Sequence, residues 1–369
     1  MSRVDKNKKP KYYSLDKILS FDATYNIVFG ERSNGKTYAV LDYALKEYFA
    51  GHGELAVIRR WDEDFRAKRG ASLFSAHVQN GLITKYSRGK WNSVYYYSGR
   101  WYLANYDEKT QKTKKDEKPF AYAFSLNTME HDKSTSFPNI TTILFDEFLT
   151  RDAYIADEFV VFTNVLSTII RQRNNVKIFM LGNTVNMYSP YWAEMGLNKV
   201  RQMKPGDIQP YSYGDSRLKV VVEYTEPNTE GKASDFYFAF DNPKLQMIKS
   251  GEWEIANYPH CPVSYKPIDV VFEYFIVFEE DILHAEVIQH DDLLFTFIHK
   301  KTTELKNTDY DLIYTTEYSP RPNYRRNILK PISKAEKSIY AMFKSDKVFY
   351  QDNLVGEIVR NYIQWCGQN

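Results

Sequence analysis

Apolar runs of strand length alternate with helical patterns through the first two hundred residues. Four runs rich in β-branched and aromatic residues are typical of buried strands. They are Tyr25–Phe29, Glu54–Arg60, Thr141–Phe148 and Val176–Thr184. Lys36–Phe49 and Asp157–Arg173 instead repeat apolar residues at helical spacing. This alternation predicts an α/β fold with a mostly parallel sheet covered by helices on both faces.

The pattern changes after Arg201. The following segments are rich in Gly, Pro, Ser and charge, which favours a linker with a few short elements. From about Tyr258, four strand candidates precede two helical patterns, an order typical of a separate α+β domain. The predicted organisation is therefore residues 1–200 as one domain, 201–257 as a linker region and 258–369 as a smaller C-terminal domain.

A charged segment, Tyr106–Phe120, interrupts the first domain. It contains five lysines and no apolar residue between Asp107 and Lys118, which predicts a solvated, mobile loop. Lys133, in "MEHDKSTSFPN", is a second loop cation. Each can contact phosphates or a neighbouring subunit, or can simply keep the surface soluble.

Composition excludes several classes of protein. Of 369 residues, 43% are hydrophobic and 16% aromatic, enough to fill two cores. The net charge of +2 excludes a polycation, so any nucleic-acid site must be a local patch. The distant Cys261 and Cys366 form no Cys/His cluster, which argues against disulfides, a zinc site and secretion. The basic N-terminus lacks a signal-peptide core, and the most apolar segment, Val270–Phe278, is too short for a membrane span, so we expect a cytoplasmic protein.

The stretch "FGERSNGKTY" fits the phosphate-loop pattern G-x-x-x-x-G-K-[ST] between a predicted strand and a predicted helix. In such a loop, backbone N–H groups and the helix N-terminus face the phosphates of a nucleotide. Lysine neutralises their charge and the threonine hydroxyl binds Mg²⁺. The expected ATP-binding residues are Gly30, Glu31, Arg32, Ser33, Asn34, Gly35, Lys36 and Thr37.

A second strand, "TTILFDEF", delivers two carboxylates at its C-terminal end. Beside a phosphate loop, Asp146 is expected to hold Mg²⁺ with Thr37, and Glu147 to polarise the attacking water. Asn183 or Thr184, after the next strand, is either a γ-phosphate sensor or an ordinary turn residue. Because parallel strands end at one edge of the sheet, these side chains should converge there.

Two arginines, Arg171 and Arg173, end the helical pattern. They can complement the helix dipole, or one of them can reach a neighbouring subunit's nucleotide as an arginine finger. The residues alone favour the dipole interpretation.

The C-terminal region is locally basic. His299–Lys347 contains 11 Lys/Arg and 6 Asp/Glu, an excess of 11 − 6 = 5, interleaved with Tyr310, Tyr314, Tyr318 and Tyr324. Such a surface suits contact with a phosphate backbone without base readout, or is a basic face on a tyrosine-rich protein.

Several blocks together resemble a known family. "FGERSNGKTY", "VIRRWDED", "FPNITTILFDEF", "IIRQRNNVKIFMLGN" and "DNLVGEIVRNYIQW" are similar to blocks of the DNA-packaging ATPases of small, short-tailed bacteriophages of the Picovirinae type. The resemblance covers most of the first two hundred residues and resumes weakly at the C-terminal helix.

This resemblance implies a P-loop NTPase of the ASCE type, with an additional central strand and a catalytic glutamate. It implies a pentameric ring at the portal of a prohead in the host cytoplasm, which pumps double-stranded DNA and hydrolyses ATP with Mg²⁺. By position, Glu147 is the catalytic base, Arg171 the finger acting on a neighbouring subunit, and Lys133 a lid lysine. Whether a scaffold RNA takes part is left open.

The same resemblance implies a C-terminal nucleic-acid or portal-binding domain, similar to an RNase H-like nuclease without its catalytic carboxylates. Six carboxylates are candidates for a retained metal site, but no pattern gathers them, so no nuclease activity is expected. They are Asp269, Glu273, Glu279, Asp281, Asp291 and Asp292.

Two other functions compete with the translocase. A large terminase with a working nuclease would cut DNA as well as pump it. A nucleotide-gated switch would hydrolyse slowly and would not need Glu147 as a base.

Overall fold

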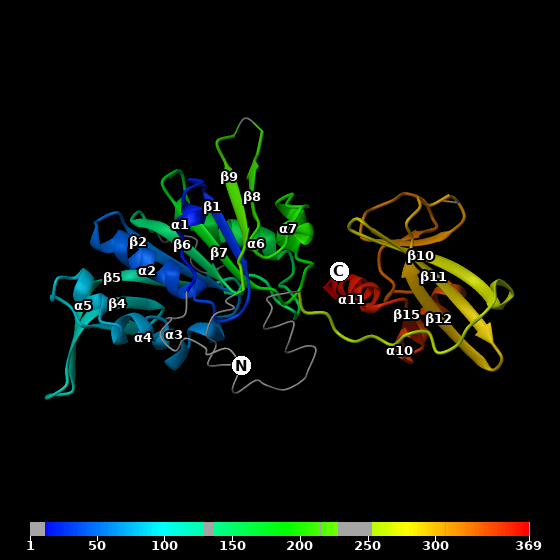
Figure 1. The fold of residues 1–369 in the computed structure, drawn as a ribbon, viewed down its shortest axis with the longest axis horizontal. Helices are drawn as coiled ribbons and strands as arrows, with labels where there is room; N and C mark the ends of the chain where they lie inside the picture. The colour runs from blue at the N-terminus through cyan, green and yellow to red at the C-terminus, as the bar shows by residue number, and fades with distance from the viewer. Residues whose placement is uncertain (1–11, 129–135, 215, 228–252, 307, 369) are drawn as a thin grey trace, which may run out of the picture. The chain divides into compact units, whose positions relative to one another are not determined.

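The computed structural model describes residues 12–128, 136–214, 216–227, 253–306 and 308–368 (Figure 1). The chain divides into two compact units, Met1–Glu254 and Ile255–Asn369, and each is described by itself. Lys133 and residues 228–252 of the predicted linker lie outside the described residues.

The first unit is built on a nine-stranded sheet in the order β3-β4-β5-β2-β6-β7-β1-β9-β8. The six central strands of this order, β5-β2-β6-β7-β1-β9, pair in parallel with their neighbours, whereas β3, β4 and β8 pair antiparallel at the edges. The strands are β1 (Tyr25–Gly30), β2 (Glu54–Arg59), β3 (Ser93–Tyr97), β4 (Arg100–Asp107), β5 (Lys112–Ser125), β6 (Ile140–Asp146), β7 (Lys177–Asn183), β8 (Ile208–Ser212) and β9 (Lys219–Tyr224).

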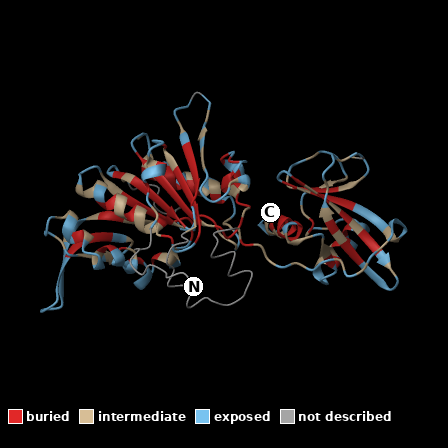
Figure 2. Ribbon diagram, in the orientation of Figure 1, coloured by how far each residue is buried: buried red, intermediate tan, exposed pale blue. Residues whose placement is uncertain are grey.

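Helices cover both faces of this sheet, and the central strands are buried between them (Figures 1 and 2). Successive side chains of a strand point to opposite faces, so Ile27 and Phe29 enter one apolar core while Val28 enters the other. The helices are α1 (Asp16–Leu19), α2 (Lys36–Phe49), α3 (Lys68–Ser72), α4 (Ser75–Gln79), α5 (Leu82–Tyr86), α6 (Glu158–Ile170) and α7 (Pro190–Glu194). The predicted α/β class is confirmed, and none of the described helices combines the length and apolar character of a membrane span.

The second unit contains a six-stranded mixed sheet in the order β14-β13-β10-β11-β12-β15. Strand β10 pairs antiparallel with β11 and parallel with β13, and β12 lies on the other side of β11. The four predicted strands and the two predicted helices are present, with the short β15 between the two helices. The elements are β10 (Val270–Phe278), β11 (Asp281–His290), β12 (Leu293–Lys300), β13 (Leu312–Thr315), β14 (Tyr324–Arg325), α10 (Lys334–Lys344), β15 (Val348–Tyr350) and α11 (Asn353–Gln368).

The structure corrects two predictions. The charged segment is not an irregular loop, because β4 and β5 continue into it as a paired hairpin (Figure 1), although residues 105–115 are exposed as expected. The predicted domain boundary at residue 200 is also wrong. Strand β9 pairs with β1, so residues 208–224 complete the first unit's sheet instead of forming a linker.

Candidate functional site

The phosphate-loop pattern lies in the predicted strand–loop–helix arrangement, between β1 and α2. Gly30 and Gly35 have φ values of 148° and 95°, and a Cβ on Gly30 would lie 2.1 Å from Thr225 Oγ1. Glycine is therefore required at position 30 by backbone conformation and by space. Ser33, at φ 61°, adds a second left-handed turn to the loop.

Lys36 is buried and turned back into the loop. Its Nζ donates to the Glu31 carbonyl oxygen (2.6 Å), to Asn34 Oδ1 (3.2 Å) and to Asn183 Oδ1 (3.4 Å). Burial lowers the pKa of Lys36 to about 8, although the carboxylates of Asp146 and Glu31 oppose the shift. The ammonium group is thus placed among oxygen acceptors at the N-terminus of α2, where a phosphate would stabilise its charge.

Further contacts hold the loop from outside. Asn34 Nδ2 donates to Thr225 Oγ1 at the end of β9, at 3.0 Å. Arg32 Nη2 lies 3.6 Å from Glu254 Oε1, and the Glu254 backbone N–H donates to the Thr184 carbonyl oxygen (2.9 Å). The loop is thereby tied to β9 and to the last residue of the first unit.

The predicted carboxylates converge on this loop from β6. Thr37 Oγ1 lies 3.1 Å from Asp146 Oδ1, and Arg59 Nη2 donates to Asp146 Oδ2 at 2.8 Å. The strand register explains the convergence, because Gly30 pairs with Asn183 and Asp146 pairs with Leu181 at the carboxyl ends of parallel strands. A cavity of about 430 Å³ lies here, lined by Arg32, Ser33, Asn34, Gly35, Lys36, Thr37, Tyr38, Asp146, Glu147, Leu181, Gly182 and Asn183.

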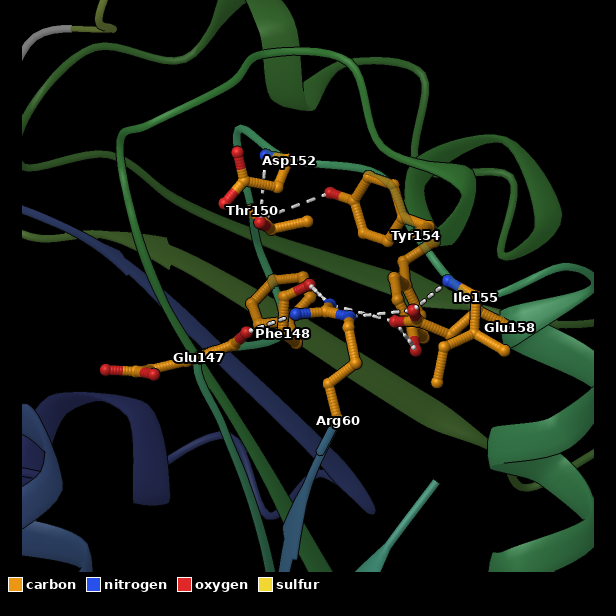
Figure 3. A network of polar contacts seen from close by, with 9 residues as sticks. Arg60, Glu147, Phe148, Thr150, Asp152, Tyr154, Ile155 and Glu158 are labelled. Atoms are coloured by element: carbon orange, nitrogen blue, oxygen red, sulfur yellow. Dashed lines mark hydrogen bonds and ion pairs between the residues drawn. The ribbon is translucent and has the colours of Figure 1, made fainter. Parts of the chain in front are cut away.

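Glu147 follows Asp146 on a turn with a left-handed backbone, φ 60°. Arg60 holds this turn, since its Nη1 donates to the Glu147 carbonyl oxygen (3.2 Å) and its Nη2 to the Phe148 carbonyl oxygen (2.8 Å). The Glu147 carboxylate points away from Arg60 (Figure 3) and lines the cavity. The turn thus presents an exposed carboxylate from a fixed backbone.

Arg60 is in turn fixed by Glu158 at the start of α6. The two side chains form a bidentate ion pair, with Arg60 Nε and Nη2 donating to the two carboxylate oxygens at 2.7 and 2.9 Å (Figure 3). Glu158 also accepts from the Ile155 N–H (2.9 Å) and from the Tyr191 hydroxyl (2.8 Å). Both partners are buried and well hydrogen-bonded, which is the condition under which a buried ion pair is tolerated.

The other predicted residues lie outside this cavity. Arg171 is exposed immediately after α6 and does not line the cavity. Arg173 instead donates to backbone carbonyls, including those of Ile169 and Phe137 at 2.8 and 3.1 Å, which is a structural role. Of the four predicted surface tyrosines, Tyr310 and Tyr318 are exposed, but Tyr314 lies in the core on β13.

Sequence reasoning assigned no role to Arg59, Arg60, Glu158 or Thr225. Two adjacent arginines at the end of a predicted central strand could have indicated buried acidic partners, because a buried charge without a counter-charge destabilises the folded protein. Their partners are not local, because Arg60 and Glu158 are 98 residues apart and Asn34 and Thr225 are 191 apart.

The six candidate nuclease carboxylates do not form a group. Among the described residues, the one set of three or more potential metal ligands is His284, Glu286 and His299, which contains none of the six. Asp281 pairs with Lys300 at 2.9 Å, and Asp269 with His290 at 3.4 Å.

Comparison with known proteins gives a consistent set of relatives. A family model for podovirus DNA encapsidation protein (Gp16) matches residues 92–203. The DNA packaging protein of Bacillus phage PZA is 26% identical over 294 residues, which are 78% of this chain and 79% of that protein. The DNA packaging protein of Bacillus phage B103 is 30% identical over 184 residues, about half of either chain (49% and 50%).

Two solved structures share the fold across nearly the whole chain. The viral genome packaging motor assembly of bacteriophage phi29 superposes with a TM-score of 0.55 at 20% identity, covering 97% of this chain and 99% of that chain. The phi28 gp11 DNA packaging motor gives a TM-score of 0.53 at 17% identity, with 97% of both chains covered. At these identities the likeness concerns the fold.

Proposed function

Because this chain belongs to the family of podovirus DNA encapsidation proteins, we propose that it is an ATPase that drives double-stranded DNA into a viral prohead. The observation that carries the proposal is the convergence of Lys36, Thr37, Asp146 and Glu147 on one cavity. A DNA-binding protein that only gripped its substrate would not need a strand-borne carboxylate beside a phosphate loop.

The strand order supports the ASCE class of P-loop NTPase. Strand β7 separates the phosphate-loop strand β1 from the carboxylate strand β6, which agrees with the additional central strand expected of that class. In this assignment Gly30–Thr37 bind the phosphates of ATP, and Asn183, which accepts from Lys36, is proposed to respond to the γ-phosphate. The C-terminal unit is proposed to contact DNA or the portal.

Thr37 and Asp146 fit a Mg²⁺ ion by the chemistry of their donors. A hydroxyl and a carboxylate oxygen 3.1 Å apart beside a phosphate loop are the hard oxygen ligands that Mg²⁺ takes from P-loop proteins. When bound, Mg²⁺ neutralises charge on the β- and γ-phosphates. Arg59, on the other oxygen of Asp146, holds that carboxylate in place.

Glu147 is proposed to accept the proton of the attacking water as that water's oxygen bonds to the γ-phosphorus. The bond between the γ-phosphorus and the oxygen bridging it to ADP breaks, and Lys36 and the loop N–H groups stabilise the charge on the phosphates. Arg171 is exposed and lies outside the cavity of its own subunit, which supports a role at the nucleotide site of a neighbouring subunit. The ring that these subunits form is proposed to be pentameric. Lys133 stays a prediction, as does the absence of nuclease activity.

The decisive test is ATP turnover by the full chain, with and without double-stranded DNA, across protein concentration. We expect turnover to rise with DNA and more steeply than linearly with protein, because subunits must meet to complete each site. Lys36→Ala provides the blank. Turnover that is linear in protein and indifferent to DNA would mean a self-contained ATPase and would remove the packaging assignment.

A mixing experiment isolates the intersubunit step. Lys36→Ala cannot use its own nucleotide but carries Arg171, whereas Arg171→Ala has an intact loop. If Arg171 acts on a neighbour, mixing the two inactive proteins should restore part of the turnover. No recovery in mixed rings, with assembly checked by light scattering, would return Arg171 to a surface role.

The pKa of Lys36 makes a separate prediction. A bound phosphate favours the protonated amine of Lys36. Above about pH 8 the free amine is mostly neutral and must take up a proton when ATP binds, so the affinity for ATP should fall as the pH rises. Between pH 7 and pH 9 the charged fraction falls about tenfold, and affinity for ATP should fall with it. Displacement of a fluorescent ATP analogue measures the affinity at each pH. The same pH profile for Lys36→Ala measures the contribution of all other titrating groups. Parallel slopes for the two proteins would contradict the prediction.

A further inference from the structure

Three potential metal ligands meet on one face of the second unit's sheet. His284 and Glu286 lie two residues apart on β11, so their side chains share a face, and His299 on β12 is the direct cross-strand partner of His284. Their ligand atoms all lie within 4.8 Å of one another. The two cysteines take no part, which is why their spacing could not reveal the group.

The separations suit a single ion. His299 Nε2 lies 3.5 Å from Glu286 Oε2. Tetrahedral zinc, with bonds of about 2.0–2.1 Å, places neighbouring ligand atoms about 3.3 Å apart. The observed spacing is therefore nearly that of a coordinated pair.

His284 Nε2 lacks a hydrogen-bond partner among the described residues. It is buried and makes no hydrogen bond, because the nearest carboxylate oxygen, on Glu273, is beyond hydrogen-bond distance. A buried polar atom without a partner is costly, and it indicates a ligand when other donors face it. His284 therefore brings a nitrogen without a hydrogen-bond partner in the described part of the chain to the group of three residues.

The surroundings orient the ligands as metal sites require. Phe275 stacks on the His284 ring (centroids 4.8 Å apart) and Phe297 on the His299 ring (5.7 Å). His299 Nδ1 lies 3.4 Å from the Lys300 carbonyl oxygen, and the Tyr265 hydroxyl donates to Glu286. Such outer contacts fix the ring orientation and the carboxylate in known metal centres.

We propose that His284, Glu286 and His299 bind one Zn²⁺ ion between β11 and β12, with water in the fourth position. Two imidazoles and a carboxylate are ligands suited to this ion, and the donors come from paired strands, so the ion would join them across the sheet. This site is independent of the nucleotide cavity, which draws its residues from the first unit.

The test uses the full chain after treatment with a chelator that is then removed. Zn²⁺ alone is titrated by isothermal calorimetry into the wild type, His284→Asn, His299→Asn and Glu286→Gln. We expect one tight equivalent in the wild type, and a loss of affinity of more than about 100-fold when either histidine is replaced, since even outer partners contribute 10–100-fold. His290→Asn is the matched control, because His290 lies on β11 beside Asp269 but outside the group, and it should bind like the wild type.

Co²⁺ provides a second measurement that does not depend on affinity. The wild type should show the intense visible absorption of a tetrahedral site, and His284→Asn should lose it. Circular dichroism of each metal-free variant checks folding, and Glu286→Gln keeps the shape of the carboxylate if a histidine variant unfolds. Absence of a tight equivalent in the wild type, or equal binding by all variants, would overturn the proposal.

Discussion

Glu147→Gln is expected to reduce ATP turnover by about 10²–10⁴-fold while leaving ATP binding nearly unchanged. Glutamine keeps the shape of the side chain but cannot accept the proton of the attacking water. The carboxylate lines the cavity from the turn after β6, whereas the loop proposed to bind phosphate is Gly30–Thr37. The measurement pairs steady-state phosphate release with equilibrium binding of a fluorescent ATP analogue.

Asp152→Asn is the matched control for this variant. Asp152 is an exposed carboxylate on the same connection between β6 and α6 (Figure 3) but does not line the cavity. It should turn over ATP at the wild-type rate. If Glu147→Gln also kept the wild-type rate, the nucleotide-gated switch would become the better description of the protein.

Glu158→Ala is expected to destabilise the first unit by about 3–5 kcal/mol, because Arg60 would remain buried without a counter-charge. For a unit of this size, that corresponds to a fall in melting temperature of about 6–20 °C. Differential scanning calorimetry of the full chain measures the shift, with the transition of the second unit as an internal reference.

A double variant separates stability from the site. Arg60→Met with Glu158→Leu removes both charges, so most of the lost stability should return. The carbonyls of Glu147 and Phe148 would still lack their donor, and turnover should stay low at temperatures where the protein is folded. Full recovery of turnover together with stability would show that Arg60 supports the fold and does not position Glu147.

The parts of the site that sequence reasoning located are those encoded in consecutive residues. The phosphate loop and the Asp146–Glu147 pair each combine a strand pattern with polar residues at its end, and parallel pairing then brings the ends together. Asn183 followed from the same reasoning. These predictions depend on one rule about strand ends and on no knowledge of tertiary contacts.

The parts that were missed depend on pairing between distant segments. The hairpin of β4 and β5 is exposed, so hydrophobic periodicity cannot reveal it. Strand β9 is a short apolar run between segments rich in Gly, Pro and charge. The composition of those segments predicts a linker, so the strand within them was not predicted. The His284–His299 pair appears only when β11 and β12 are in register. One residue of slippage would send the two rings to opposite faces.

The contact between Arg32 and Glu254 has a mechanical meaning. Glu254 is the last residue of the first unit, and it is held by a residue of the phosphate loop and by the backbone after β7. Any displacement of Arg32 is therefore transmitted to the residue that stands one peptide bond before the second unit. The two residues thus connect the phosphate loop to the start of the second unit through the chain itself.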